Sequence, residues 1–306
     1  MFYFTLKRLF WAVPTLLLII TIAFFLMRIA PGGPFSKERP VAPEILANIN
    51  KVYHLDESLP EQYMRYLGNV LQGDLGPSYK YKDFSVNELI GLGFPVSAQI
   101  GGIAILLALL IGVSLGILAA LRQNTPTDYT VMTVAMFGIT IPTFVTAPFM
   151  TLVFGVLLTW LPIGWDDDNW TSLIMPIIAL SLPQIAIIAR LMRGSMIEVL
   201  RSNYVRTARA KGLSERLAIL RHSLKPAMVP VLSYIGPAVA GIITGSIIIE
   251  QTFNIPGIGR HFVQGALNRD YPMVMGVTIL YGALIVFFNL VVDIIYGFLD
   301  PKVRYD

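Results

Sequence analysis

The sequence predicts an all-α integral membrane protein with six transmembrane helices. Hydrophobic residues make up 55% of the 306-residue chain and charged residues only 14%, whereas soluble domains carry about 25% charged residues. The mean hydropathy is +0.66, which indicates a chain solvated by lipid. A helix needs about 20 mostly apolar residues to cross a bilayer. Six stretches satisfy this requirement, at residues 9–29, 97–121, 131–161, 173–191, 227–249 and 273–299.

The first stretch follows Lys7 and Arg8, as the apolar region of a secretory signal would. It is longer than such a region, and no clear cleavage site of small residues follows it. We therefore expect it to be retained as a signal anchor. The third and sixth stretches are longer than a bilayer requires, which leaves room for tilt or kinks.

The composition excludes several kinds of chemistry. The chain has no cysteine, so disulfides, zinc ribbons and cysteine nucleophiles are impossible. His54, His222 and His261 lack the spacing of metal ligands, and the acidic run 166–168 lacks the spaced ligands of a calcium loop. No nucleophile has a base nearby in the sequence, and no Gly-rich phosphate loop is present. We expect no catalysis, no metal and no cofactor in this chain.

The distribution of Lys and Arg predicts the orientation of the helices. The segment between the fourth and fifth stretches carries many bases and one acid, Glu215. Its basic residues are Arg201, Arg206, Arg209, Lys211, Arg216, Arg221 and Lys225. The loop after the third stretch has three aspartates at 166–168 and no base. We expect the basic segment and both termini in the cytoplasm and residues 31–94 outside. The positions of the charges therefore indicate that the net charge of +4 orients the helices in the membrane and does not bind nucleic acid.

The basic segment also has the pattern of a docking helix-turn-helix. Tyr204, Ala208, Lys211 and Gly212 lie at helical spacing among small residues, which allow a partner to approach closely. Gly212 suits the left-handed conformation that ends many helices, and Ser214 can cap the next helix. Bulky apolar residues that would bind a lipid surface are absent from its first half. This favours a protein partner, and the alternative is a positive-inside anchor alone.

Residues 204–212, with Pro230 downstream, resemble the cytoplasmic coupling loop of binding-protein-dependent ABC importer permeases. That loop commonly reads Glu-Ala-Ala, three residues, then Gly. Here the positions before Gly212 hold Arg206, Thr207 and Ala208, so the acid is absent. The peptide and nickel branch of the family typically shows the form found here. Stretches at 73–76, 250–272 and 293–305 extend the resemblance over essentially the full length.

The resemblance implies a type I ABC importer-like fold with a coupling loop at 199–226. It implies a first helix within 1–30, an outer loop region at 31–94 and a five-helix core at 95–306. The implied partners are a second homologous permease subunit forming a heterodimer, two cytoplasmic ATPases that bind ATP and magnesium, and a periplasmic solute-binding protein that delivers peptide. The implied location is the bacterial inner membrane. The residues expected to contact the ATPase are Tyr204, Arg206, Thr207, Ala208, Ala210, Lys211 and Gly212.

Small residues and prolines within the apolar stretches predict close packing and bending. Two small-residue pairs are expected at helix contacts, Gly112 with Gly116 and Gly241 with Gly245. Prolines are expected to kink the helices and to border a conduction path beside the third, fourth and fifth stretches. These kink positions are Pro142, Pro148, Pro183 and Pro237.

The alternative function is transport without ATPases. A secondary transporter or channel would need ionisable groups within the membrane. The candidates are Arg190, Arg193 and Asp293, which we interpret mainly as anchors near the inner ends of their helices. A membrane hydrolase is a third option, but the sequence contains no catalytic constellation for it.

Segment 31–94 is expected to form small helices that contact the binding protein, gate the pore or cover the helix ends.

Overall fold

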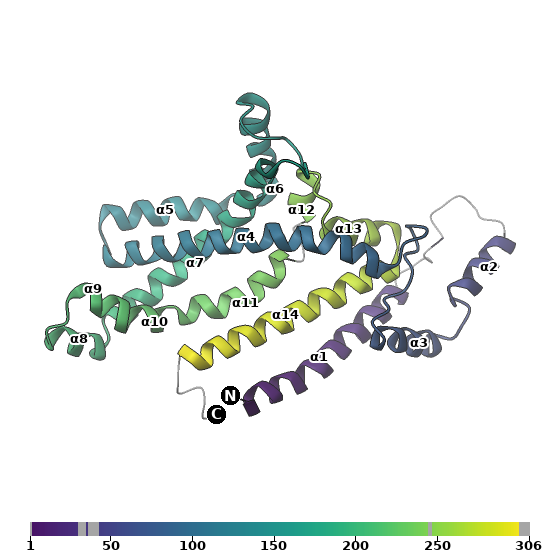
Figure 1. Ribbon diagram of the computed structural model, residues 1–306, viewed down its shortest axis with the longest axis horizontal. Coiled ribbons are helices and arrows are strands. Elements are labelled where there is room, and N and C mark those ends of the chain that lie inside the picture. The colour runs from purple at the N-terminus through teal and green to yellow at the C-terminus, as the bar shows by residue number, and fades with distance from the viewer. Residues whose placement is uncertain (1, 30–34, 36–42, 244–246, 300–306) are drawn as a thin grey trace.

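The computed structural model describes residues 2–29, 35, 43–243 and 247–299. Within these residues the regular secondary structure is entirely helical, apart from one isolated β-bridge between Pro77 and Ser85. Five segments are long and apolar enough to cross a membrane: Thr5–Ile29, Val86–Leu121, Trp170–Leu200, Val229–Thr252 and Tyr271–Ile295. Figure 1 shows their helices running side by side along the long axis of the molecule. The all-α membrane fold predicted from the sequence is confirmed.

The helices of these five segments, in chain order, are as follows. They are α1 (Phe2–Ile29), α4 (Val86–Leu121), α7 (Ile174–Leu200, preceded by the 3-10 turn η2 at Trp170–Leu173), α11 (Val229–Ile243) with α12 (Ile247–Thr252), and α14 (Tyr271–Leu299). Between α7 and α11 lie α8 (Asn203–Ala210), α9 (Glu215–Leu217), the π-helix η3 (Ala218–Ser223) and α10 (Leu224–Ala227). Helix α13 (Ile258–Asn268) connects α12 to α14.

The third apolar stretch is broken. Helix α5 (Pro126–Thr140) ends before Pro142, and α6 (Thr143–Met150) with the π-helix η1 (Thr151–Leu157) turns away from α5 by 97°. The kink expected at Pro142 is present as a full break, and the count of six is reached when the bent pair is taken as one span. Ile141 is extended, with φ −91° and ψ 115°, because a residue before proline avoids the helical conformation. Figure 1 shows α6 projecting from the other helices.

Helix α7 lies at the centre of a closely packed group with α4 and α5. A Cβ atom at Gly112 would lie 2.9 Å from the Cβ of Ile188, and one at Gly116 would lie 2.6 Å from the Cβ of Met192. Both glycines of the predicted pair thus lie where α4 crosses α7. Gly138 of α5 packs equally closely on α7. Small residues let helix backbones approach in this way.

Helix α14 packs between α11 and α1 and forms the other side of the molecule. At its contact with α11, a Cβ atom on Gly236 would lie 2.9 Å from the Oδ1 atom of Asn289. The N-terminal end of α1, the end of α14 and the segment α8–α9 lie toward the same end of the long axis (Figure 1). The placement of these ends on the cytoplasmic side of the membrane stays a prediction.

The opposite end carries the small helices predicted within segment 31–94. They are α2 (Pro43–Val52) and α3 (Leu59–Leu71), and residues 31–34 and 36–42 lie outside the described part of the chain. Helix α3 begins with a capping box in which the backbone N–H of Ser58 donates to Glu61 Oε2 over 3.0 Å. Ser85 and Glu88 cap α4 in the same manner. Such boxes satisfy backbone donors at helix starts, so the sequence fixes both boundaries locally.

Candidate functional site: an exposed basic helix-turn-helix

The basic segment folds into two short helical arms joined by a tight turn, as predicted. Helix α8 ends with a hydrogen bond from the Gly212 N–H to the Arg209 carbonyl (2.9 Å) and another from the Leu213 N–H to the Ala208 carbonyl (3.3 Å). This pair is a Schellman motif, which requires a left-handed residue after the helix. Gly212 occupies that position with φ +84°. The conformation expected for Gly212 is confirmed.

The inside of this segment is formed by two small apolar residues of α8. Val205 is fully buried and Ala208 is 8% exposed, and α8 packs on η3, where Ala218 and Ser223 are buried. Ala208 therefore holds the two arms together and does not present its methyl group at the surface. This differs from the predicted exposed strip of small residues, since the helical spacing of Ala208 directs it toward the second arm.

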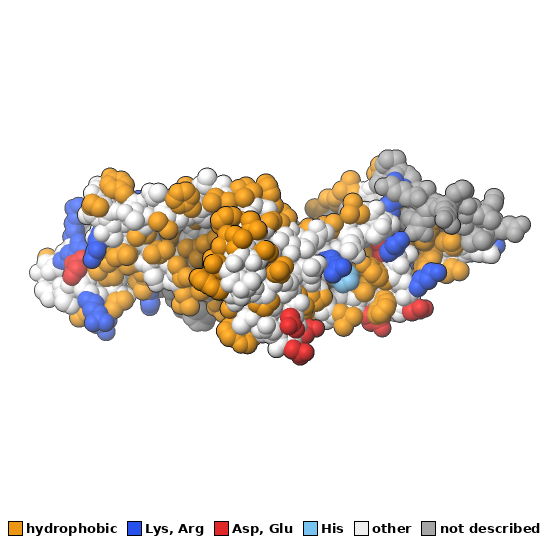
Figure 2. Space-filling view, turned by 90° about the horizontal axis from the view of Figure 1, so that it is seen from above, with side chains coloured by type: hydrophobic (Ala, Val, Ile, Leu, Met, Phe, Trp, Pro, Cys, Tyr) orange, Lys and Arg blue, Asp and Glu red, His pale blue; other side chains and the backbone are white. Residues whose placement is uncertain are grey.

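The outside of the segment combines apolar and basic side chains. Tyr204, Leu217 and Leu220 are each about half exposed, at 49%, 49% and 51%. Arg206, Thr207, Ala210, Lys211 and Gly212 are also exposed. We call this set the loop surface: Tyr204, Arg206, Thr207, Ala210, Lys211, Gly212, Leu217 and Leu220. Figure 2 shows Lys and Arg side chains gathered at this end of the molecule. Half-exposed apolar groups beside bases are suited to an acidic or mixed protein surface.

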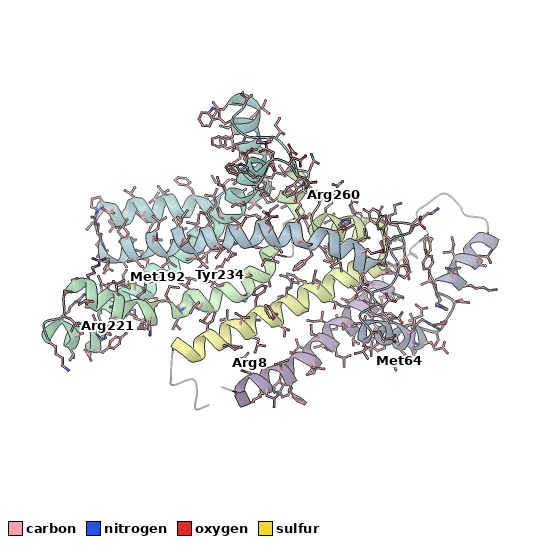
Figure 3. The ribbon with its side chains drawn as sticks, viewed as in Figure 1. Arg8, Met64, Met192, Arg221, Tyr234 and Arg260 are labelled. Carbon is pink, nitrogen blue, oxygen red and sulfur yellow. The ribbon has the colours of Figure 1, made fainter. Side chains whose placement is uncertain are left out.

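One ion pair spans the turn. Arg209 donates to Glu215, with 2.6 Å between Arg209 Nη2 and Glu215 Oε1. Glu215 is the acid that opposed the basic residues in the sequence, so its charge is already paired within the segment. Exposed pairs of this kind contribute at most about 1 kcal/mol. Arg206 and Lys211 of the loop surface stay exposed, as does the nearby Arg221, which Figure 3 places at the same end of the molecule.

An ion pair between a buried acid and a half-buried base joins α5 to α7 at the end of the helices that is nearest this segment. Arg193 contacts both oxygens of Asp128 over 2.6 Å, and the Asn124 N–H donates to Asp128 Oδ2 over 2.9 Å. Asp128 is 1% exposed. The sequence identified Arg193 as an anchor but did not identify Asp128. The available signal was an acid in the first helical turn after Pro126, although its partner lies 65 residues away.

The other ionisable candidates are also engaged. Asp293 of α14 pairs with Arg8 of α1 over 3.0 Å, and Arg190 donates to the sulfur of Met136. Neither belongs to a chain of acids or histidines, and the described residues contain no cluster able to hold a metal ion. A proton relay of the kind expected for a secondary transporter thus finds no support in this part of the chain.

A second buried carboxylate fastens the connection between α12 and α13 to α4. Glu250 is 4% exposed and accepts from the Ser97 hydroxyl (2.7 Å) and the Arg260 N–H (2.9 Å). Ser97 in turn accepts from the Ile258 N–H over 2.9 Å. A Cβ atom at Gly257 would lie 2.5 Å from Ser97 Oγ, so this position has room only for glycine. Ser97 and Glu250 lie 153 residues apart in the chain, so no local pattern predicted their contact.

Two of the larger hollows among the described residues lie beside α5 and beside α11. One, of about 410 Å³, lies between α5 and α7 beside the Asp128–Arg193 pair. The other, of about 390 Å³, is lined by Gly241, Ile247, Gly259, Phe262, Val277, Thr278 and Tyr281. Neither is lined by the predicted kink positions: Pro142 lies at the α5–α6 break, and Pro148, Pro183 and Pro237 lie inside α6, α7 and α11. The hollow beside α11, α13 and α14 involves the fifth and sixth apolar stretches.

The second predicted glycine pair is placed differently from the first. The nearest atom to a Cβ on Gly241 would be the Tyr281 hydroxyl at 3.7 Å, an ordinary contact at the edge of the hollow of about 390 Å³. Gly245 lies outside the described residues. Gly241 is therefore a lining residue in this chain and does not mark a tight helix crossing.

The fold and the exposed basic segment define a helical membrane protein of the transporter class. Comparison with known families makes this specific. Residues 112–305 match the family described as binding-protein-dependent transport system inner membrane component, and residues 1–86 match its N-terminal model. The chain belongs to this family of membrane transport components. The resemblance found in its sequence is confirmed.

Individual relatives cover the entire chain. The chain is 56% identical to the oligopeptide transport system permease protein OppB of Escherichia coli K12 over 306 residues, which is 100% of each protein. It is 53% identical to OppB of Haemophilus influenzae over the same length. It is 43% identical to the dipeptide transport system permease protein DppB of Bacillus subtilis over 305 residues, covering 98% and 97% of the two chains.

Solved structures agree with the fold. An amino acid ABC transporter crystallised with histidines superposes with a TM-score of 0.52 at 14% identity, covering 68% of this chain and 93% of that chain. The MetNI methionine ABC transporter in an inward-facing conformation gives a TM-score of 0.50 at 17% identity, covering 71% and 95%. At these identities the similarity concerns the fold, which is that of ABC importer permeases.

Proposed function

We propose that this chain is the permease subunit of an ATP-driven importer of oligopeptides in a bacterial inner membrane. The observation that carries the proposal is the identity of 56% over the whole length to an oligopeptide permease. The exposed loop surface supports it, because a permease without its own nucleotide site needs a surface that receives the ATPase. In this proposal catalysis, ATP and magnesium belong to partner subunits.

The proposed complex pairs this chain with a second homologous permease, two cytoplasmic ATPases and a periplasmic solute-binding protein. Closure of the ATPases would displace the loop surface, and α8 follows α7 after only Arg201 and Ser202. A displacement at the loop would therefore reach the transmembrane helices through a short connection. This is allosteric coupling between a nucleotide site and a substrate path.

The substrate class follows from the relatives and suits the hollow beside α11, α13 and α14. Its lining is mostly apolar, with Thr278 and Tyr281 as polar groups, and it has no charged residue to select one side chain. Such a path is suited to peptides whose sequence varies. Selection would then rest on the binding protein.

Deletion of the gene for this chain tests the substrate class. We expect uptake of several unrelated tri- to pentapeptides to fall together to background, because they share one path. Uptake of each radiolabelled peptide would be measured beside free amino acids and a nickel chelate as controls. Loss of uptake of the chelate alone, with normal peptide uptake, would show that the peptide assignment is wrong.

Labelling of single cysteines tests the orientation. The chain has no cysteine, so Lys211→Cys and Asp167→Cys each introduce one reactive site at an exposed position. With an impermeant thiol reagent on spheroplasts, we expect Asp167→Cys to label at once and Lys211→Cys only after permeabilisation, because of the positive-inside rule. The reverse pattern would contradict cytoplasmic placement of the loop surface.

A further inference from the structure

A cavity of about 130 Å³ lies at the end of the molecule opposite the loop surface, between α1, α3 and the start of α14. We call it the Arg28 pocket. It is lined by Arg28 of α1, Gln62, Arg65 and Tyr66 of α3, Tyr53, His54 and Tyr79 of the connections, and Tyr271 and Met275 of α14. A water needs about 10–15 Å³ of such space, so the cavity accommodates a group several times larger than one water.

Arg28 enters this cavity without a counter-ion. Its Nε atom donates to Gln62 Oε1 over 3.0 Å, and Gln62 is held by hydrogen bonds from its own amide to the carbonyls of Leu55 (3.3 Å) and Glu57 (2.9 Å). No carboxylate among the described residues pairs with Arg28. Arg28 is half-buried, and a charge that is partly withdrawn from water is stabilised by a negative partner.

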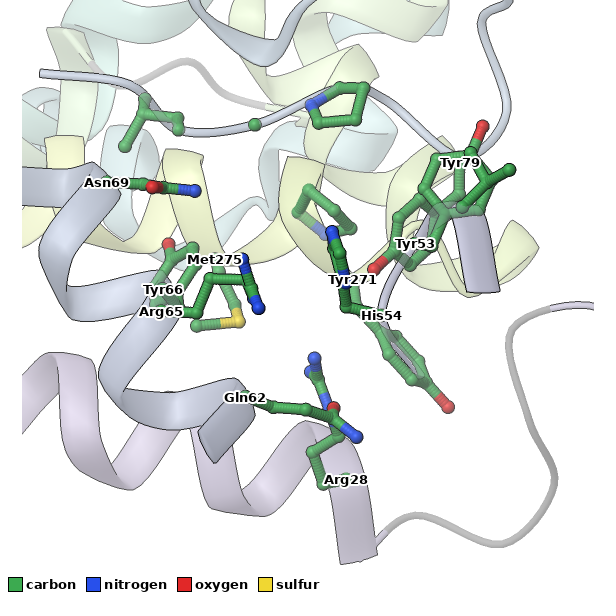
Figure 4. A pocket seen from close by; sticks show the side chains of 15 residues that line it. Arg28, Tyr53, His54, Gln62, Arg65, Tyr66, Asn69, Tyr79, Tyr271 and Met275 are labelled. Atoms are coloured by element: carbon green, nitrogen blue, oxygen red, sulfur yellow. The ribbon is translucent and has the colours of Figure 1, made fainter. Parts of the chain in front are cut away.

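Two donors on residues that line this space have no hydrogen-bond partner among the described residues. The Nη1 atom of Arg28 and the hydroxyl of Tyr66 are both buried and have no hydrogen-bond partner within the described chain. The guanidinium is held in place by ring contacts, with its Cζ 4.4 Å from the centre of Phe24 and 5.6 Å from that of Tyr271. Figure 4 shows the Arg28 and Arg65 side chains directed into the same space.

The other charges around the pocket leave it positive. Glu57 is shared by Arg65, whose Nε lies 3.1 Å from Oε2, and by His54, whose Nδ1 lies 3.1 Å from Oε1. Burial raises the pKa of Tyr79 to about 12 and raises the pKa of Tyr66 further. Both hydroxyls therefore keep their protons at neutral pH and act as donors. Buried donors around an unpaired guanidinium are the requirements of an oxyanion site.

We propose that the Arg28 pocket binds the phosphate of a phospholipid headgroup. Arg28 is the last residue but one of the apolar segment Thr5–Ile29, which places it at the level where headgroups and interfacial tyrosines meet. On the neighbouring face of α1, Leu18, Ile22 and Ile29 are 60%, 50% and 75% exposed. These residues lie at one-face helical spacing, so acyl chains have an apolar surface directly below the phosphate.

The pocket is separate from the hollow proposed for substrate. Tyr271, Pro272 and Met275 of α14 line the Arg28 pocket, whereas Val277, Thr278 and Tyr281 line the hollow of about 390 Å³. A peptide carboxylate is also an oxyanion that accepts hydrogen bonds from a guanidinium. The position at the lipid-facing first helix favours the lipid.

Native mass spectrometry of the assembled importer tests the proposal. The complex, reconstituted in nanodiscs of phosphatidylethanolamine and phosphatidylglycerol, would be transferred to detergent and its retained phospholipids counted. We expect Arg28→Gln to lower the retention of one phospholipid per permease copy by roughly tenfold, because a charge-assisted bond is lost. Tyr66→Phe removes one neutral donor and should lower retention a few-fold. Lys7→Gln, at the other end of α1, should leave retention unchanged.

Further measurements separate the sources of the anion. Equal retention in wild type, Arg28→Gln and Tyr66→Phe would overturn the proposal. Arg28-dependent binding of labelled inorganic phosphate to the stripped complex, without phospholipid retention, would overturn the lipid source. If Arg28→Gln instead raised the half-saturating concentration of peptides but not of their C-terminal amides, the pocket would serve the substrate carboxylate. If Arg28→Gln fails to assemble, Tyr66→Phe alone decides, since it keeps the charge.

Discussion

Replacing Asp128 by Asn is expected to lower the free energy of unfolding by about 1.5–3 kcal/mol, because it removes the charge-assisted hydrogen bonds to the half-buried Arg193. Asp128 is 1% exposed, and Arg193 reaches both of its oxygens over 2.6 Å. The neutral amide keeps the shape of the carboxylate but cannot balance the guanidinium. The pair also joins α5 to α7, so its loss should loosen these helices. Denaturant unfolding of the purified chain in detergent measures the change.

Two variants make this prediction specific. Removing both charges, in Asp128→Asn with Arg193→Gln, should recover much of the loss, because no guanidinium is then left without its counter-ion. Glu215→Gln breaks the exposed pair with Arg209 and should cost at most about 1 kcal/mol. If Asp128→Asn costs no more than Glu215→Gln, the Asp128–Arg193 pair does not stabilise the fold as described.

Replacing Gly212 by Val is expected to reduce peptide uptake by about tenfold or more while the chain still inserts in the membrane. Gly212 has φ +84°, a conformation that costs a non-glycine residue on the order of 1–3 kcal/mol, and 1.4 kcal/mol is about tenfold in an equilibrium. No atom lies within 4 Å of a Cβ placed there, so the effect would come from backbone strain. The Schellman turn would open and change the angle between α8 and the second arm.

The measurement is substrate-stimulated ATPase activity of the assembled complex in lipid, beside uptake. Gly212→Asn is the matched control, because Asn adopts the left-handed conformation more readily than Val; it should remain near wild type. Ala208→Trp should also impair coupling, although by a different route, because Ala208 is buried against the second arm. Normal uptake and hydrolysis in Gly212→Val would leave the segment as a positive-inside anchor.

Local features of the fold could be predicted because their causes lie in neighbouring residues. Long apolar runs predicted α1, α4, α7 and α14, since lipid requires every backbone group to be satisfied within a helix. The left-handed Gly212 followed from its place after a short helical pattern. The contact of Gly112 and Gly116 with α7 agreed with the spacing of small residues, although the sequence did not say which helix they would meet.

Features that depend on distant residues could not be predicted. Apolar composition is the same on both sides of Pro142, so it does not reveal that α6 leaves α5 at 97°. In an ideal helix Leu217, Leu220 and Leu224 would lie on one face. The π-helix η3 (Ala218–Ser223) intervenes, and Leu217 and Leu220 remain exposed. The partners Asp128 and Arg193, or Ser97 and Glu250, meet only after the helices pack.

The glycine contacts of α7 have a mechanical consequence. Because α4 and α5 approach α7 so closely that no Cβ fits at Gly112, Gly116 or Gly138, these three helices resist shear and would rotate as one stiff body. Helix α1 instead packs on α14, on the other side of the molecule. A push on α8, which follows α7 directly in the chain, would therefore be converted into tilt of the whole α4–α5–α7 body and not into sliding between its helices.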